Sequence, residues 1–381
     1  MLTPDELERM PKEIEKLMSS LELELMYDII RRIKEVGTIT RATDYQIYKL
    51  YQIGESKKAI KLYIQHALEL SDEELDNLYN EVIDNGYTRE KSIYKASGKN
   101  FIEYKDNPTM QQLVSAIKEQ TKGEFRNITN STGFIHLENG KTTFVPIIEY
   151  YQNTLDRAVM DISTGAFDYN TVIKRTIDEM TKSGLRTVSF SKTRTDRIEV
   201  ATRRAILTGI NQVVGKINEE NAERLQTKHF ETSAHGTARP SHQKWQGRVY
   251  TMQELKDICG LGKVDGLCGA NCRHSYSPFI IGVSKRRYTD EELEKWAEEE
   301  NTPRKYGDKE YTAYEASQEQ RRLERLLRKQ KQDVNLLKKA DANDEDITNA
   351  QARYRITSEE YAKFSKAMGL PEQRARVYPI K

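Results

Sequence analysis

The chain has 381 residues, of which 37% are hydrophobic and 31% charged, so it can bury a substantial core but must also form much solvent-facing helix. Lys and Arg total 61 against 59 Asp and Glu, and this near-neutral balance excludes a bulk-basic nucleic-acid-binding protein. Three cysteines, an odd number, argue against a secreted disulfide framework. The first residues, MLTPDELERM, lack the basic and apolar stretches of a signal peptide, so we expect synthesis in the cytosol.

Residues 1–125 are predicted to form an N-terminal helical region. Thr3-Pro4-Asp5-Glu6 combines a capping threonine, a proline at the first helical position and a carboxylate that can reach back to the cap. The same spacing predicts further helix starts at Thr43-x-x-Gln46, Ser71-x-x-Glu74 and Thr109-x-x-Gln112.

Residues 126–228 are predicted to contain a hairpin followed by long helices. Phe134–Leu137 and Thr142–Val145 flank an Asn-Gly pair, which favours the tight turn of a β-hairpin. Apolar residues at helical spacing predict helices over 147–162, about 168–183 and about 196–225, with a short strand at Thr187–Phe190.

Residues 182–204 carry seven basic and two acidic side chains, the clearest local charge excess in the chain. A solvated face is the favoured interpretation, and contact with DNA phosphates or an acidic partner is the alternative. The residues predicted for nucleic-acid binding are Arg186, Lys192, Arg194, Arg197, Arg203 and Arg204.

Residues 288–381 are predicted to form a charged helical C-terminal tail. Ala313–Asp341 reads as a heavily charged helix with few apolar positions. Thr357-x-x-Glu360 predicts the start of a last helix, which would end near Gly369 and Pro371.

A compact module at residues 229–287 contains the most informative residues. All three cysteines and four of the six histidines lie between His229 and His274. Thiolate and imidazole are preferred zinc ligands, which gives a candidate metal set of His242, Cys268, Cys272 and His274. The C-x3-C and C-x-H spacings depart from the usual close pairs of zinc sites, so a metal is only one of three interpretations.

Catalysis is the second interpretation of the module. The sequence has none of the motifs of zinc deaminases, zincin proteases, serine hydrolases or P-loop proteins. A Cys/His pair, or a nuclease using His229, His235, Arg239 or His242, stays open. The third and favoured interpretation is a structural module, in which imidazoles and guanidinium groups bond irregular loop backbone around Trp245.

A family resemblance rests on this module. Arg239-Pro240-Ser241-His242-x-x-Trp245-x-Gly247, followed by Cys268-Gly-Ala-Asn271-Cys272-Arg273-His274 and Pro278-Phe279, resembles the phage minor capsid protein 2 family. More distantly it is similar to the MuF-type head-morphogenesis domain, where an N-C-R-C element ends in a cysteine. Here His274 takes that place, which keeps a metal ligand and removes a disulfide.

The resemblance implies a structural, non-enzymatic minor protein of a tailed-phage head, located in the capsid interior near the portal and made in the host cytoplasm. The partners it implies are the portal and major capsid proteins, together with scaffold protein and phage DNA. No cofactor is certain, and a structural zinc ion is the one considered. The alternatives are a phage-delivered nuclease using the His/Cys cluster and a DNA-binding packaging factor. We expect a predominantly α-helical α+β fold.

Overall fold

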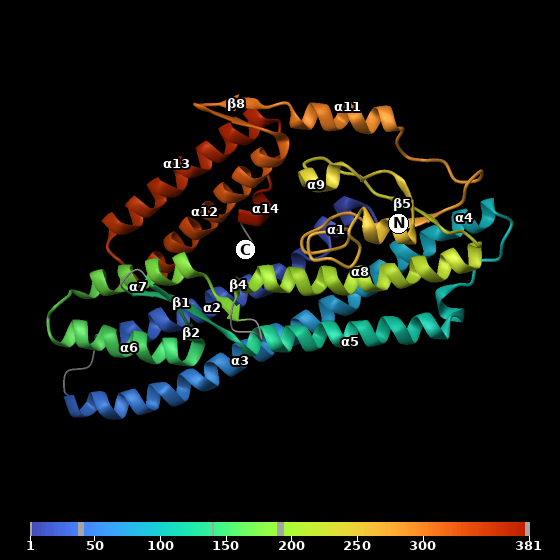
Figure 1. Ribbon diagram of the computed structural model, residues 1–381. Helices are drawn as coiled ribbons and strands as arrows, with labels where there is room; N and C mark the ends of the chain where they lie inside the picture. The colour runs from blue at the N-terminus through green and yellow to red at the C-terminus, as the bar shows by residue number, and fades with distance from the viewer. Residues whose placement is uncertain (1, 37–41, 139–140, 189–193, 378–381) are drawn as a thin grey trace. The chain divides into compact units, whose positions relative to one another are not determined.

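The computed structural model describes residues 2–36, 42–138, 141–188 and 194–377, and it confirms a predominantly helical α+β fold (Figure 1). The helices are α1 (Pro4–Arg9), α2 (Lys12–Val36), α3 (Ala42–Val82), α4 (Lys91–Ala96), α5 (Pro108–Asn130), α6 (Ile147–Ser163), α7 (Tyr169–Ser183), α8 (Ile198–Leu225), α9 (Pro240–Gln243), α10 (Met252–Asp257), α11 (Asp290–Asn301), α12 (Ala313–Lys339), α13 (Asp344–Met368) and α14 (Arg374–Val377). A π-helical turn η1 (Ile83–Tyr87) and 3₁₀ turns η2 (Thr88–Glu90) and η3 (Tyr104–Asp106) join α3 to α5. Within the described ranges, no helix is both long and apolar enough to cross a membrane.

The chain divides into two compact units, each assembled from three separate stretches of sequence. The first unit contains residues 1–14, 72–125 and 203–318, and the second contains residues 15–71, 126–202 and 319–381. The four consecutive regions expected from the sequence remain a prediction.

The second unit contains a four-stranded antiparallel sheet of order β2-β1-β3-β4. Its strands are β1 (Thr132–Glu138), β2 (Lys141–Pro146), β3 (Arg186–Val188) and β4 (Thr195–Arg197). The register of β1 and β2 pairs Phe134 with Val145, which confirms the predicted hairpin, although its Asn-Gly turn lies outside the described residues. The ring of Phe134 packs against Tyr150 of α6 at a centroid distance of 4.6 Å, so the hairpin and α6 share a core.

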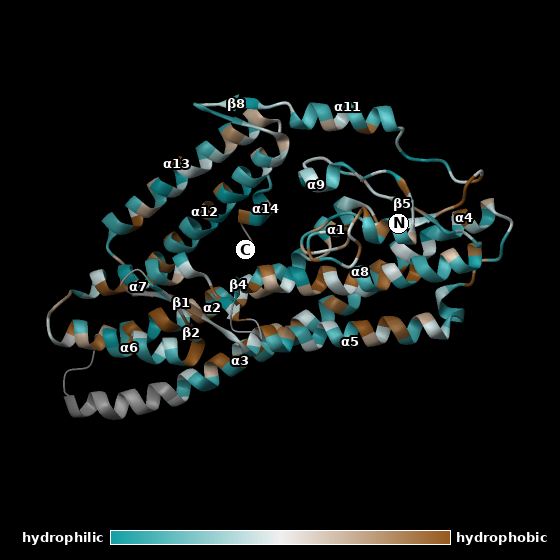
Figure 2. Ribbon diagram, in the orientation of Figure 1, coloured by the Kyte–Doolittle hydropathy of each residue, from teal (hydrophilic) through white to brown (hydrophobic). Residues whose placement is uncertain are grey.

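The first unit contains the His/Cys module, built on a three-stranded antiparallel sheet of order β6-β5-β7. Its strands are β5 (His229–Thr232), β6 (Val249–Thr251) and β7 (Tyr276–Phe279), and a separate hairpin pairs β8 (Arg304–Tyr306) with β9 (Lys309–Tyr311). Figure 2 shows α11 of this unit as almost wholly hydrophilic. Only Leu293 of that helix is buried.

The spacing of a capping residue and a Glu or Gln three residues later predicted some helix starts correctly and others wrongly. At Thr3 both reciprocal hydrogen bonds with Glu6 form and Pro4 opens α1, so this prediction is confirmed. The starts at Ser71 and Thr357 are wrong, because α3 and α13 run through them. Each hydroxyl instead donates to the carbonyl four residues earlier, that of Ala67 for Ser71 and that of Arg353 for Thr357.

The two remaining predicted starts are those at Thr109 and Thr43. α5 begins at Pro108 rather than after Thr109, because the side chain of Asn107 accepts the hydrogen bond from the amide of Met110. The side chain of Thr43 lies outside the described residues. In α13 the cap is Asn343, whose side chain accepts from the amide of Asp346.

Candidate functional site: a buried His/Cys cluster

Short elements place the cluster residues at the edge of the β6-β5-β7 sheet. His242 lies on α9, which Pro240 opens at its first position. Cys272 and His274 lie on the loop that enters β7. Asn211 and Asn218 of α8 donate to the carbonyls of Cys268 and Tyr276, at 3.0 Å and 2.6 Å, so the loop is fixed against that helix.

A small apolar core supports the cluster. It joins Trp245 and the buried thiol of Cys259 to residues of the sheet and of α8; the buried members are Ala222, Phe230, Trp245, Leu255, Cys259, Leu267 and Tyr276. The Trp245 ring lies 4.7 Å, centroid to centroid, from both the His242 and the His274 ring. These contacts hold both imidazoles in fixed orientations.

Three potential ligand atoms come together on top of this core. The Sγ atom of Cys272 lies 3.5 Å from Nδ1 of His274 and 3.9 Å from Nδ1 of His242. His242 and Cys272 are 2% exposed and His274 is 1% exposed. Their three ligand atoms all lie within 4.8 Å of one another, close enough to hold one metal ion.

The outer nitrogen of each imidazole has its own oxygen partner. Nε2 of His242 lies 2.8 Å from the carbonyl oxygen of Asp265, and Nε2 of His274 lies 2.9 Å from Oε1 of Gln246. Burial lowers the pKa of His242, and it lowers the pKa of His274 well below its usual value, so it favours the neutral form of both rings. Burial raises the pKa of the Cys272 thiol, against the lowering effect of the backbone amide of His274.

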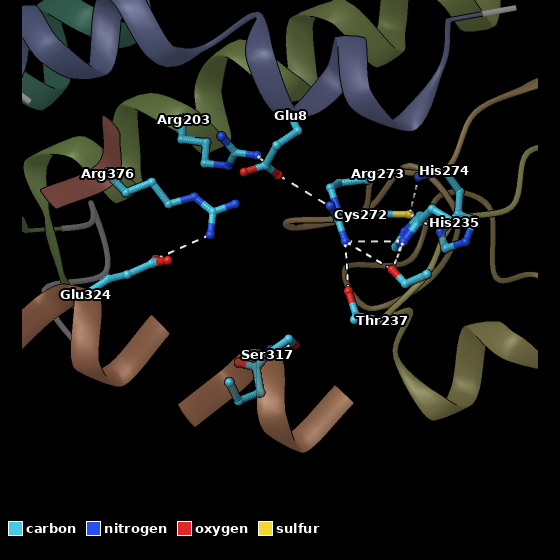
Figure 3. A network of polar contacts seen from close by, with 12 residues as sticks. Glu8, Arg203, His235, Thr237, Cys272, Arg273, His274, Ser317, Glu324 and Arg376 are labelled. Carbon is cyan, nitrogen blue, oxygen red and sulfur yellow. Dashed lines mark hydrogen bonds and ion pairs between the residues drawn. The ribbon is translucent and has the colours of Figure 1, made fainter. Parts of the chain in front are cut away.

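A network of charged side chains borders the cluster within the first unit (Figure 3). Glu8 of α1 forms ion pairs with Arg203 of α8, at 3.0 Å, and with Arg273, at 3.9 Å. Arg273 also reaches the hydroxyl of Thr237 at 3.4 Å and Nδ1 of His235 at 3.2 Å. Burial, followed by the charge of Arg273, lowers the pKa of His235 to about 4.

The family-motif residues shape backbone around the cluster. Arg239 donates to the carbonyl of Ala270 at 2.6 Å, which joins the two halves of the motif. Asn271 has a positive φ of 57°, a conformation that asparagine tolerates better than most residues. Gly247 has a φ of 69°, a conformation that L side chains rarely adopt, and a Cβ there would lie 2.8 Å from the side chain of Leu293, which would have to shift. Ser241 is exposed, and nothing in the structure explains its place in the motif.

Three of the four residues predicted as metal ligands therefore lie together, while Cys268 is placed differently. Its thiol faces the carbonyl oxygen of His274 at 3.6 Å, and Cys268 is not part of the three-residue group. Burial raises the pKa of this thiol well above its usual value. The four-residue set stays a prediction.

The residues predicted for nucleic-acid binding have varied environments. Arg186 donates to the carbonyl oxygen of Ser183 at 3.0 Å, and burial, followed by the nearby Arg197, lowers its pKa. Arg194 is 67% exposed and pairs with Asp196. Arg203 pairs with Glu8, Arg204 lies half-buried on α8, and Lys192 is outside the described residues. DNA binding by this set stays a prediction.

Two residues important to the geometry were not identified from the sequence. Gln246 occupies a position that the motif leaves open, between Trp245 and Gly247, and no spacing rule marks it as a partner of His274. Glu8 lies far away in sequence, in a helix whose charge pattern is ordinary. Only the tertiary structure reveals these two partners.

Residues 2–365 match the family described as phage minor capsid protein 2. The chain belongs to this family. The match covers nearly the whole chain, so it confirms the resemblance that the residues around Arg239 and Cys272 indicated and extends it to the helices on both sides. Membership in the phage minor capsid protein 2 family supports a structural role in a phage. The comparisons with curated proteins and with solved structures found no match.

Proposed function

We propose that this phage minor capsid protein is a non-enzymatic component of a tailed-phage head. In this proposal it lies inside the head near the portal and acts in head assembly or in DNA packaging and delivery. Its partners there are the portal and major capsid proteins, with scaffold protein and DNA as further contacts. The MuF-type similarity belongs to the same proposal.

The burial of the His/Cys cluster is the observation that carries the non-enzymatic part of the proposal. A general base or nucleophile must reach its substrate, directly or through one water. His242, Cys272 and His274 are at most 2% exposed, and both outer ring nitrogens bond to oxygens of the module itself. This burial and internal hydrogen bonding support a structural role, in which the cluster stabilises the loops of the module, rather than catalysis of a reaction.

Two of the basic residues predicted for nucleic-acid binding already have partners within the chain, which favours a protein-binding role for the chain over binding of DNA phosphates. Arg186 and Arg203 already bond backbone and carboxylate within their own units. A phosphate contact by Arg203 would have to compete with Glu8, which lies 3.0 Å away. Salt-sensitive DNA binding that falls on replacement of Arg194 and Arg197 would instead support the packaging-factor alternative.

Purified virions of a phage that encodes this chain test the proposal. We expect mass spectrometry to find the chain at a low copy number relative to the major capsid protein. We also expect the tagged chain, isolated during assembly, to bring down portal protein. Absence from virions would overturn the proposal.

A nuclease assay tests the non-enzymatic part separately. The purified full chain is incubated with DNA and with RNA, with and without chelator, and we expect no cleavage. Cleavage by the wild-type chain that His242→Ala abolishes would establish the enzymatic alternative.

A further inference from the structure

The thiol of Cys272 has one proton to donate, but two imidazole nitrogens face it, Nδ1 of His242 and Nδ1 of His274. A carbonyl oxygen can only accept, so Nε2 of His242 must carry the proton that binds Asp265. A ring that is protonated on Nε2 alone presents the lone pair of its Nδ1 to the sulfur of Cys272, 3.9 Å away.

The same reasoning fixes the tautomer of His274. Oε1 of Gln246 accepts the backbone amide of His235 at 3.2 Å, which sets the orientation of the Gln246 side-chain amide. Nε2 of His274 must therefore donate to that oxygen, and its Nδ1 presents a second lone pair to Cys272. Two buried lone pairs thus face one thiol, which has a single proton.

A divalent metal ion would satisfy all three atoms together. Zinc bonds of about 2.3 Å to sulfur and about 2.0–2.1 Å to nitrogen, at a tetrahedral angle, place S and N about 3.6 Å apart. The two observed S–N distances are 3.5 Å and 3.9 Å. Imidazole ligands of metals typically donate their other N–H to an oxygen, as both rings do here. The backbone amide of His274 also donates to the sulfur, at 3.4 Å.

We infer that His242, Cys272 and His274 bind one zinc-class divalent ion through Nδ1, Sγ and Nδ1. Binding breaks the S–H bond of Cys272, releases that proton to solvent and forms three metal–ligand bonds, with no change of oxidation state. The ion joins α9 to the loop before β7. It thereby stabilises the irregular backbone of this loop, which otherwise packs only on a small apolar core. This metal site goes beyond the proposed role in the phage head and is independent of it.

Cys268 provides the matched control, because it is a second, partly buried thiol of the same loop that lies outside the three-residue group. We expect the full-length wild-type chain, purified with added zinc and then dialysed, to retain one zinc ion per chain by elemental analysis. Cys268→Ser should also retain one ion. Cys272→Ser should weaken zinc binding by more than about 100-fold, beyond the 10–100-fold cost of losing an outer hydrogen-bond partner.

Two further measurements keep the test informative if Cys272→Ser folds poorly. Zinc added to the metal-free wild-type chain in weakly buffered solution should release one proton per ion bound. Cobalt should give the absorption of a tetrahedral site with one thiolate ligand. A wild-type chain that binds no zinc, or a Cys268→Ser chain that loses the ion as fully as Cys272→Ser, would overturn the assignment. Two-thiolate cobalt absorption that Cys268→Ser reduces to one would likewise overturn the three-donor set, in favour of the four-residue set predicted from the sequence.

Discussion

Arg203 of α8 forms an ion pair with Glu8 of α1 at 3.0 Å, and the two side chains are only 17% and 13% exposed. Glu8 also approaches Arg273 of the His/Cys module, so one carboxylate serves two guanidinium groups of the first unit. A basic side chain that the sequence grouped with potential DNA contacts is therefore held in an ion pair within its own unit.

We predict that Arg203→Gln lowers the free energy of unfolding by about 1–3 kcal/mol, because it leaves the largely buried Glu8 with less compensation. The midpoint of urea unfolding measures this change. Arg194→Gln is the control, since Arg194 is 67% exposed and its pair with Asp196 should be worth about 0–1 kcal/mol. Equal effects of the two substitutions would contradict this assignment.

Glu6 gives a prediction for the dependence of stability on pH. Burial alone would raise the pKa of Glu6, but hydrogen bonds from Arg89 and Thr3 lower it overall. The contribution of Glu6 is therefore complete above its ordinary pKa of 4.5, and it is lost as the pH falls below that value, where the unfolded chain takes up the proton first.

We expect Glu6→Gln to cost about 1–3 kcal/mol at pH 7 and clearly less at pH 4, measured as urea midpoints of the variant and the wild type. Glu24→Gln, at an exposed position of α2, is the control and should change little at either pH. A cost for Glu6→Gln that does not depend on pH would show that the carboxylate charge is unimportant.

Gly266 lies in the loop whose Asp265 carbonyl accepts the hydrogen bond from Nε2 of His242. A Cβ at Gly266 would lie 2.1 Å from the carbonyl oxygen of Gly260, so the loop must open to admit alanine. We expect Gly266→Ala to destabilise the chain by at least about 2 kcal/mol and to weaken zinc binding. At Gly123, in α5, no atom other than those of its chain neighbours and the helix's own backbone lies within 4 Å of an added Cβ, and Gly123→Ala should be neutral or stabilising in thermal unfolding. A stable Gly266→Ala chain would show that this turn is not constrained.

Gln246 should control metal affinity without binding the metal. Gln246→Leu removes the oxygen that fixes the tautomer of His274, and we expect zinc affinity to fall about 10–100-fold in competition with a chromogenic chelator. Gln246→Glu keeps an acceptor at that position and should retain most of the affinity. If Gln246→Leu binds zinc as tightly as the wild type, the hydrogen bond does not orient the ring.

The local sequence was sufficient where a structure depends on neighbours in the chain. The hairpin of β1 and β2 follows from alternating strands around an Asn-Gly pair, and α6 from one apolar stripe, because both patterns are local. The concentration of cysteine and histidine identified the module and its family, since rare residues in fixed order carry more information than helical segments do.

Only the tertiary structure decided which of the capping patterns in the sequence start a helix. It also decided which polar atoms form hydrogen bonds with one another. Thr3 and Thr357 carry the same spacing to a glutamate, yet only Thr3 starts a helix, because the residues before Thr357 are already helical and its hydroxyl bonds the preceding turn. The sequence placed four candidate ligands in one module, and only the structure shows that the ligand atoms of three of them, His242, Cys272 and His274, lie within 4.8 Å of one another. Spacing along a chain does not determine the direction of a lone pair, whereas the contacts of Gln246 and Asp265 do, because each oxygen can only accept a hydrogen bond from the ring nitrogen that faces it.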